Sequence, residues 1–155
     1  MERTQPIRGF AYGVAATIAM SLVMAARAIS ETSPITEPVP KAVVTALFGL
    51  EGPPPLVAAL AVGLHLAYGG AFGALLATVA RPVTLARGLG VGVTLWLLMG
   101  VAFLPALGWG TFGTAVSPRV AVATLALHLV YGAVLGWTLG RDGGRAAGAG
   151  TATAD

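Results

Sequence analysis

The sequence contains no cysteine and very little charge. The missing cysteines exclude disulfides, thiolate metal sites and a cysteine nucleophile, and leave the redox compartment undetermined. Only 10% of the 155 residues are charged, whereas soluble domains carry about 25%. With 56% hydrophobic residues and a mean hydropathy of +0.84, the composition predicts a polytopic membrane protein, and its length allows a single domain.

Several motifs of catalysis and nucleotide binding are also missing. The chain has no phosphate-binding Gly-Lys-Ser/Thr loop, no GxSxG and no HExxH sequence. No Asp or Glu lies inside a predicted span, which argues against a carboxylate proton relay or an acidic cation site. We therefore predict no catalytic residues and no metal site, and lean away from an enzyme. The few basic residues cluster at span ends, where they suit lipid headgroups rather than nucleic acid.

Four apolar segments are long enough to cross a bilayer, since about 20 helical residues rising 1.5 Å each span its hydrocarbon core. They cover roughly 9–28, 56–80, 88–107 and 120–139. The first could also be a signal peptide cleaved after Ala26-Arg27-Ala28. Its apolar run exceeds that of a typical signal peptide, and an arginine is unusual in a cleavage site, so we interpret it as a span.

The connections between the spans are short, apart from residues 30–55. There we predict a helix of about 10 residues starting near Pro40, too short to span and therefore lying in the membrane interface. Residues 1–140 form one predicted membrane domain. The stretch 141–155 consists mainly of Gly, Ala and Thr without apolar periodicity, and is predicted to be a disordered cytoplasmic tail.

Basic residues predict the orientation, because they favour the cytoplasmic side. One side collects Arg3, Arg8, Arg81, Arg87, Arg141 and Arg145. The other side collects Arg27, Lys41 and Arg119. We expect both termini in the cytoplasm, with the chain in a prokaryotic inner membrane.

Two parts of the chain resemble each other. His65-Leu66-x-Tyr68-Gly69-x-x-x-Gly73 matches 128–136, which has the same residues at the same spacing, and 8–14 matches 87–93 more loosely. The pattern predicts an all-α, four-transmembrane-helix bundle made of two parallel two-helix repeats, plus the short interfacial helix. Their pseudo-twofold axis should lie along the membrane normal.

Glycines spaced by four recur in each span, so each span has one helix face without side chains at these positions, where another helix can approach closely. These glycines are Gly9, Gly13, Gly69, Gly73, Gly88, Gly92, Gly132, Gly136 and Gly140. In the predicted topology they fall in the cytoplasmic half, while the outer halves carry bulkier residues. We therefore expect helices that cross tightly near the cytoplasm and are more open outside.

His65 and His128 are the only histidines, and each lies about 13–15 Å from the outer end of its span, near the midplane. Tyr68 and Tyr131 follow on roughly the same helix face. One interpretation is structural: each polar side chain bonds a carbonyl or the other repeat's tyrosine. A second is a bis-histidine haem b site for electron transfer. A proton or quinone role, and a small transporter or channel with its site at the histidines, are further hypotheses.

The stretch His-Leu-Val-Tyr-Gly-Ala-Val-Leu-Gly at 128–136, preceded by Leu104-Pro105, Gly108, Gly110 and Phe112-Gly113, resembles small membrane proteins of the YagU family. The likeness covers roughly 56–140. It implies a four-span core with a histidine in the second and fourth spans, in an uncharacterised inner-membrane protein. Acid-stress tolerance is attached only to the member that gives the family its name, and this chain is shorter than that member and lacks its extended first periplasmic loop.

The favoured functional prediction is a non-enzymatic structural or accessory subunit that packs through its glycine-lined faces. Because so small a bundle leaves most residues facing lipid or an interface, we expect a homo-oligomer or a place in a larger membrane complex. The lipid bilayer is the one partner that the composition itself predicts.

Overall fold

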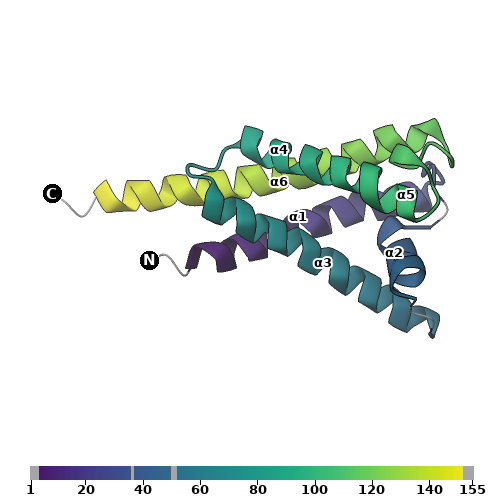
Figure 1. The fold of residues 1–155 in the computed structure, drawn as a ribbon. Helices are drawn as coiled ribbons and strands as arrows, with labels where there is room; N and C mark the ends of the chain where they lie inside the picture. Colours follow the sequence, from purple (N-terminus) through teal and green to yellow (C-terminus); the bar gives the residue numbers. More distant parts are fainter. Residues whose placement is uncertain (1–3, 36, 50–51, 152–155) are drawn as a thin grey trace.

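The described chain is entirely helical. The computed structural model describes residues 4–35, 37–49 and 52–151, and no strand occurs among them. The elements are α1 (Thr4–Ile29), α2 (Val39–Phe48), α3 (Pro54–Val79), α4 (Leu85–Leu98), the π-helical turn η1 (Met99–Phe103), α5 (Leu104–Ala106), the 3₁₀ turn η2 (Thr111–Gly113) and α6 (Pro118–Thr151). Figure 1 shows that α1 begins and α6 ends at the same end of the molecule, opposite α2 and α5.

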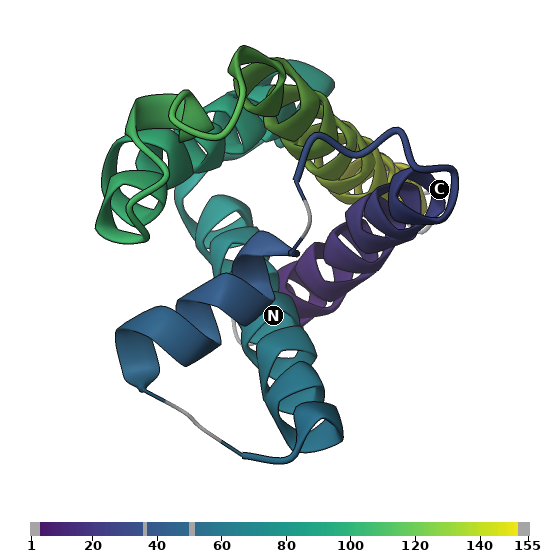
Figure 2. The same cartoon turned by 90° about the vertical axis from the view of Figure 1, so that its right-hand side faces the viewer.

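The long helices pair into two antiparallel hairpins. The first hairpin is α1 against α3, and the second is α4 against α6. The hairpins meet mainly through α1 and α6, whereas α3 and α4 make few contacts. Viewed from the α2 end, α1 and α6 lie close together while α3 and α4 diverge (Figure 2).

Four helical segments have the length and composition to cross a membrane: Gln5–Ile29, Pro54–Val79, Leu85–Ala106 and Pro118–Gly143. They correspond to the four predicted spans, with boundaries extended by a few residues at most ends. Apolar side chains are exposed along them, including Leu22 at 66%, Val62 at 58% and Val122 at 71%. Such surfaces suit contact with lipid. The prediction of an all-α chain with four helices long and apolar enough to span a membrane is confirmed.

The short helix between the first two spans is present as α2. It has proline in its first turn and ends at Gly49, whose positive φ of 59° lets its N–H bond the carbonyl of Val44. Val44 is buried against Val57 and Ala61 of α3. This contact fixes α2 across the wide end of the bundle (Figure 2).

The third span is interrupted by a π-helical turn that the sequence analysis did not predict. Within η1 the backbone hydrogen bonds span five residues instead of four, so that the N–H of Leu104 bonds the carbonyl of Met99. Pro105 follows directly and has no N–H, and its ring would clash with the carbonyl four residues before it in a regular helix. The wider turn accommodates this proline.

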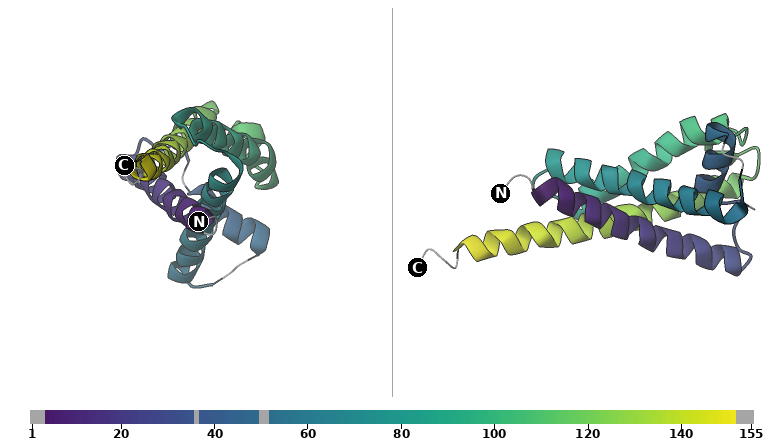
Figure 3. Two further views of the ribbon diagram at one scale, coloured as in Figure 1. Left: turned by 90° about the vertical axis from the view of Figure 1, so that its left-hand side faces the viewer. Right: turned by 90° about the horizontal axis from the view of Figure 1, so that it is seen from below.

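The predicted irregular tail is wrong for the residues that the structure describes. α6 does not end near Leu139 but continues to Thr151, and it projects beyond α1 (Figure 3). An existing helix adds residues without a new nucleation cost, and alanine favours that extension. Near the start of the extension, Asp142 accepts an ion-pair contact from Arg8 of α1 at 3.2 Å. Residues 152–155 lie outside the described part of the chain.

Candidate functional site

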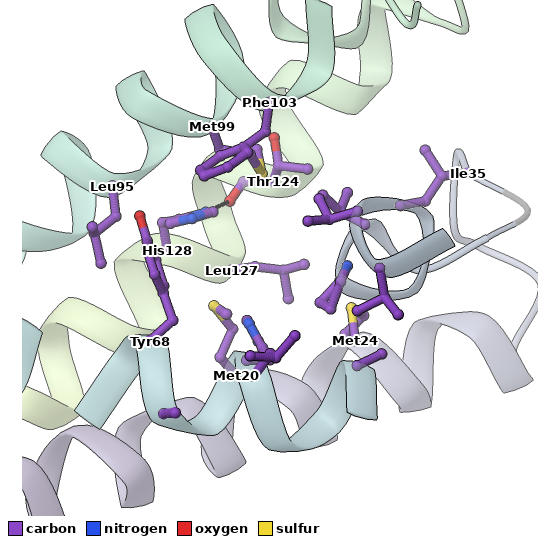
Figure 4. A pocket seen from close by; sticks show the side chains of 18 residues that line it. Met20, Met24, Ile35, Tyr68, Leu95, Met99, Phe103, Thr124, Leu127 and His128 are labelled. Atoms are coloured by element: carbon purple, nitrogen blue, oxygen red, sulfur yellow. Dashed lines mark hydrogen bonds between the residues drawn. The ribbon is translucent and has the colours of Figure 1, made fainter. Parts of the chain in front are cut away.

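A cavity of about 410 Å³ separates the two hairpins in the half of the bundle away from the start of α1 and the end of α6. α1 and α3 line one side, and α4, η1 and α6 line the other, while α2 closes the end (Figure 4). The lining residues are Met20, Met24, Ile35, Val39, Pro40, Val43, Val44, Ala61, Leu64, His65, Ala67, Tyr68, Leu95, Met99, Phe103, Thr124, Leu127 and His128. This volume falls within the range of small-molecule pockets.

The cavity wall is apolar and deformable. All methionines except Met1 line it, together with aliphatic side chains and Phe103. Methionine is unbranched and flexible, so it adapts to the shape of a neighbouring group. Among the described residues, no Lys, Arg, Asp or Glu lines the cavity. Its polar side chains are His65, His128, Tyr68 and Thr124.

His128 has one ring nitrogen fixed by the backbone of its own helix. Its Nδ1 lies 2.8 Å from the carbonyl oxygen of Thr124. A carbonyl only accepts hydrogen bonds, so Nδ1 donates and carries the proton. In the neutral ring Nε2 then has a free lone pair and acts as an acceptor. The hydroxyl of Thr124 is itself used within α6, where it donates to the carbonyl of Val120 at 2.7 Å.

His65 is less well satisfied than His128. Its Nε2 is enclosed and has no hydrogen-bond partner in the described structure. Leaving a buried polar group unpaired costs about 1–3 kcal/mol. The predicted structural role, in which each histidine bonds a carbonyl or a tyrosine, therefore agrees with the geometry of His128 but not with that of His65 Nε2.

The two tyrosines occupy different environments despite their matched sequence positions. The hydroxyl of Tyr131 donates to the carbonyl of Gly69 at 2.7 Å, and its ring is 2% exposed within the bundle core. Tyr68 lines the cavity and points from α3 toward α6, where His128 lies (Figure 4). Its ring lies tilted at 59° to that of Phe72 and meets Phe103 edge-on, with centroids 4.9 and 6.4 Å apart.

Three of the four predicted midplane residues thus share one cavity: His65, Tyr68 and His128. Tyr131 instead joins α6 to α3 through the core. Tyr68 and Tyr131 therefore do not have the equivalent surroundings that their matched motifs suggest. Packing of α1 against α6 encloses Tyr131, whereas the divergence of α3 and α4 leaves Tyr68 beside open space. The sequence motif gives the two tyrosines equal weight and contains no signal for this difference.

The glycines lie where helices approach most closely. A Cβ at Gly13 would come within 2.9 Å of the Gly70 Cα, and at Gly9 within 2.6 Å of the Gly73 carbonyl. In the second hairpin Gly88 and Gly92 face Gly132, with Gly136 near Gly88 and Leu85. Gly140 lies beside the Val83 carbonyl. The narrow half of the bundle is therefore backbone against backbone.

The cavity has an apolar border between α3 and the α4–η1 segment. Leu64 and Ala67 of α3 line the cavity and are exposed, Leu64 at 47%. On the opposite side the contact of α1 with α6 closes the bundle. The cavity is thus bordered by residues that would face the bilayer.

A small space of about 20 Å³ lies beside the main cavity near Arg27 and shares Met24, Ile35, Thr124 and Leu127 with its wall. The guanidinium of Arg27 donates to the carbonyl of Thr32 at 3.3 Å. This cation therefore lies outside the main cavity and already has a backbone partner.

Fold and site define the class: a four-span helical membrane protein with an apolar cavity between its two hairpins. The chain belongs to a family of unknown function, DUF6789, whose model matches residues 3–149. The comparisons name this family and not the YagU family that the sequence pattern resembles. Neither the curated proteins nor the solved structures contain a match to the chain.

Proposed function

We propose that this protein binds an apolar small molecule from the membrane in the cavity between its hairpins. The observation that carries the proposal is that His65, Tyr68 and His128 border one apolar cavity of about 410 Å³. Ligand sites are typically apolar pockets with a few polar groups that orient the ligand.

The glycine faces support this function better than the favoured role of a structural subunit. The glycines at Gly9, Gly13, Gly88 and Gly92 pack against the partner helix of the same hairpin. They are consequently not free to pair with a second copy or with a larger complex. Their role in the proposal is to hold the narrow half of the bundle closed, so that the cavity is confined to the other half.

The two hairpins are proposed to be repeats of one unit. Gly13 faces the Gly69 carbonyl in the first hairpin, whereas the matched Gly92 faces the His128 carbonyl in the second. Both hairpins therefore pack a glycine face against the backbone of the partner helix, in registers that differ by one turn. A parallel duplication would place both histidines on the same side of their hairpins. That arrangement accounts for their meeting at one cavity.

Haem and transport have weaker support. The fixed Nδ1 of His128 is the type of backbone contact that orients metal-ligating histidines. Haem b, however, carries two anionic propionates, and no cation lines the cavity in the described structure. A transporter or channel needs access from both sides, whereas the glycine contacts bring the backbones together at the other end.

Photolabelling in lipid nanodiscs tests the proposal. The probes are diazirine derivatives of farnesol and of farnesyl methyl ether, and peptide mass spectrometry locates the labelled residues. We expect either probe to label Met20, Met99 and their neighbours more strongly than lipid-facing Leu22. Ala67→Trp should reduce this labelling several-fold by filling the cavity border, because a large side chain there takes the ligand's space.

The matched control is Ala71→Trp, one turn along α3. Ala71 is exposed but does not line the cavity, so labelling should stay at the wild-type level. Equal labelling of the cavity residues and Leu22 by both probes would overturn the proposed function. So would an Ala67→Trp variant that is folded but labelled as strongly as Ala71→Trp.

A further inference from the structure

We infer that the ligand is an uncharged lipid bearing a hydroxyl group, which enters from the bilayer between α3 and the α4–η1 segment. This inference rests on the proposed function, because it requires the cavity to hold a ligand. It goes further by specifying the charge of that ligand, the polar group that His128 recognises and the direction of entry.

The absence of charge around the cavity selects an uncharged ligand. No Lys, Arg, Asp or Glu is among the described lining residues, and Arg27 beside the smaller space already contacts the Thr32 carbonyl. An ionised phosphate or carboxylate inside this wall would lose its hydration without gaining a counter-charge. That loss costs far more than a neutral hydrogen-bonding group does.

The hydrogen bond between His128 Nδ1 and the Thr124 carbonyl implies that the ligand must supply a hydrogen-bond donor to Nε2. Because Nδ1 donates to the Thr124 carbonyl, Nε2 of the neutral ring can only accept. A ligand hydroxyl satisfies this lone pair, whereas an ether, ketone or hydrocarbon cannot. The backbone of α6 thus sets the polarity of the site before any ligand arrives.

Tyr68 and His65 lie where they could interact with the oxygen lone pairs of the same ligand hydroxyl. A hydroxyl donates one hydrogen bond and also has lone pairs that accept. No hydrogen bond from the Tyr68 side chain to another described residue is present, so its O–H is available to donate into the cavity. His65 lines the cavity from the same helix one turn earlier.

The border of the cavity indicates the path of entry. Leu64 and Ala67 are both cavity-lining and exposed, while α1 against α6 and α2 at the end close the other sides. A lipid can therefore move sideways from the bilayer and keep its chain in an apolar environment throughout. The flexible methionines on the facing walls can adjust to chains of different shape.

Competition against the photoactivatable farnesol tests the inference in the same nanodiscs. Unlabelled farnesol and farnesyl methyl ether are compared at equal mole fractions in the lipid, since they share one chain and differ in the hydroxyl hydrogen. One buried hydrogen bond contributes about 0.5–1.5 kcal/mol, so farnesol should compete roughly three- to tenfold better. Farnesyl phosphate, which carries the same chain and a negative charge, should not compete.

Variants of His128 assign the preference to its ring nitrogen. His128→Phe keeps a planar ring but removes the acceptor, and should bring the alcohol and the ether to equal competition. His128→Gln retains an acceptor oxygen and should keep most of the preference. Tyr68→Phe should weaken direct labelling by both the farnesol and the farnesyl methyl ether probes, since the tyrosine hydroxyl donates to either oxygen.

The outcomes separate the inference from the proposed function. Labelling of the cavity with equal competition by farnesol and its ether leaves ligand binding intact but overturns the hydroxyl requirement. A preference for the alcohol that survives in His128→Phe overturns the assignment to His128. Competition by farnesyl phosphate overturns the requirement for an uncharged ligand, and failure of cavity labelling itself overturns the proposed function.

Two membrane sources can supply this chemistry, a prenyl alcohol or the reduced form of a prenylated quinone. A short-chain prenylhydroquinone is therefore added as a competitor beside farnesol. Stronger competition by the hydroquinone assigns the site to quinols, and stronger competition by farnesol assigns it to prenyl alcohols. If neither competes, the inferred ligand class is wrong.

Discussion

At the scale of single residues, Gly69 is the point where three helices meet. Its carbonyl accepts the Tyr131 hydroxyl from α6, and the same carbonyl faces Gly13 of α1. A Cβ at this position would overlap the hydroxyl of Thr17, which in turn donates to the Gly13 carbonyl at 2.8 Å. The Gly69 carbonyl therefore links the two hairpins, and a larger residue at this position would not leave room for the contacts of α1 and α6 with α3.

Replacing this glycine with alanine should destabilise the bundle. In Gly69→Ala the new methyl group forces α1 or Tyr131 to move, and overpacking of this kind costs about 1–3 kcal/mol. The measurement is the midpoint of thermal unfolding in detergent. Gly63→Ala is the control on the same helix, because no described atom lies within 4 Å of its added Cβ. Equal midpoints for the two variants would contradict the close packing at Gly69.

At the scale of the elements, a buried apolar contact holds α2 against α3. Val44 is 1% exposed and packs on Val57 and Ala61 of α3. The remaining face of α2 borders the cavity through Val39, Pro40 and Val43. A helix of this length is marginal alone, so its packing on α3 must stabilise it. The same contact closes the wide end of the cavity.

Val44→Ala should therefore loosen α2 without unfolding the bundle. Losing two buried carbon groups removes about 1–2 kcal/mol of packing, which corresponds to roughly five- to thirtyfold faster amide exchange. Hydrogen–deuterium exchange in nanodiscs measures this over residues 41–46. Ala46→Ser, at an exposed position of the same helix, should leave the exchange unchanged. Unaltered exchange in Val44→Ala would show that α2 is held by other contacts.

At the scale of the whole molecule, the helices converge at one end and diverge at the other. Small residues face one another where the hairpins are narrow, and the cavity, methionines and histidines lie where they are wide. Exposed basic residues Arg81 and Arg87 occur at the narrow end, together with the ion pair of Arg8 with Asp142. From the positive-inside rule we predict that the narrow end lies in the cytoplasm and the cavity in the outer half of the membrane.

The absence of native cysteine allows this orientation to be tested directly. Val116→Cys introduces a thiol at an exposed position near the wide end, and Ala86→Cys introduces one at the narrow end. A membrane-impermeant maleimide should label Val116→Cys in intact bacterial cells and Ala86→Cys only after permeabilisation. The cysteine-free chain provides the background signal. The opposite pattern would place the cavity in the cytoplasmic half.

The number and placement of the apolar spans and the short helix near Pro40 could be predicted from the sequence alone, because both follow from local apolar length and from proline at a helix start. The sequence also grouped His65, His128, Tyr68 and Tyr131 in one candidate site, of which all but Tyr131 line the cavity. The π turn at Met99–Phe103 could be predicted only in part. Pro105 indicates where the helix is disturbed, but not that the backbone adjusts by forming a π turn.

Only the tertiary structure decided how the matched residues differ. Tyr68 and Tyr131 have the same local motif, yet one lines a cavity and the other bonds the Gly69 carbonyl in the core. Likewise His128 has a backbone partner, while Nε2 of His65 has none in the described structure. The reason is that α1 and α6 pack together while α3 and α4 diverge, and this pairing depends on contacts between distant parts of the chain rather than on local pattern.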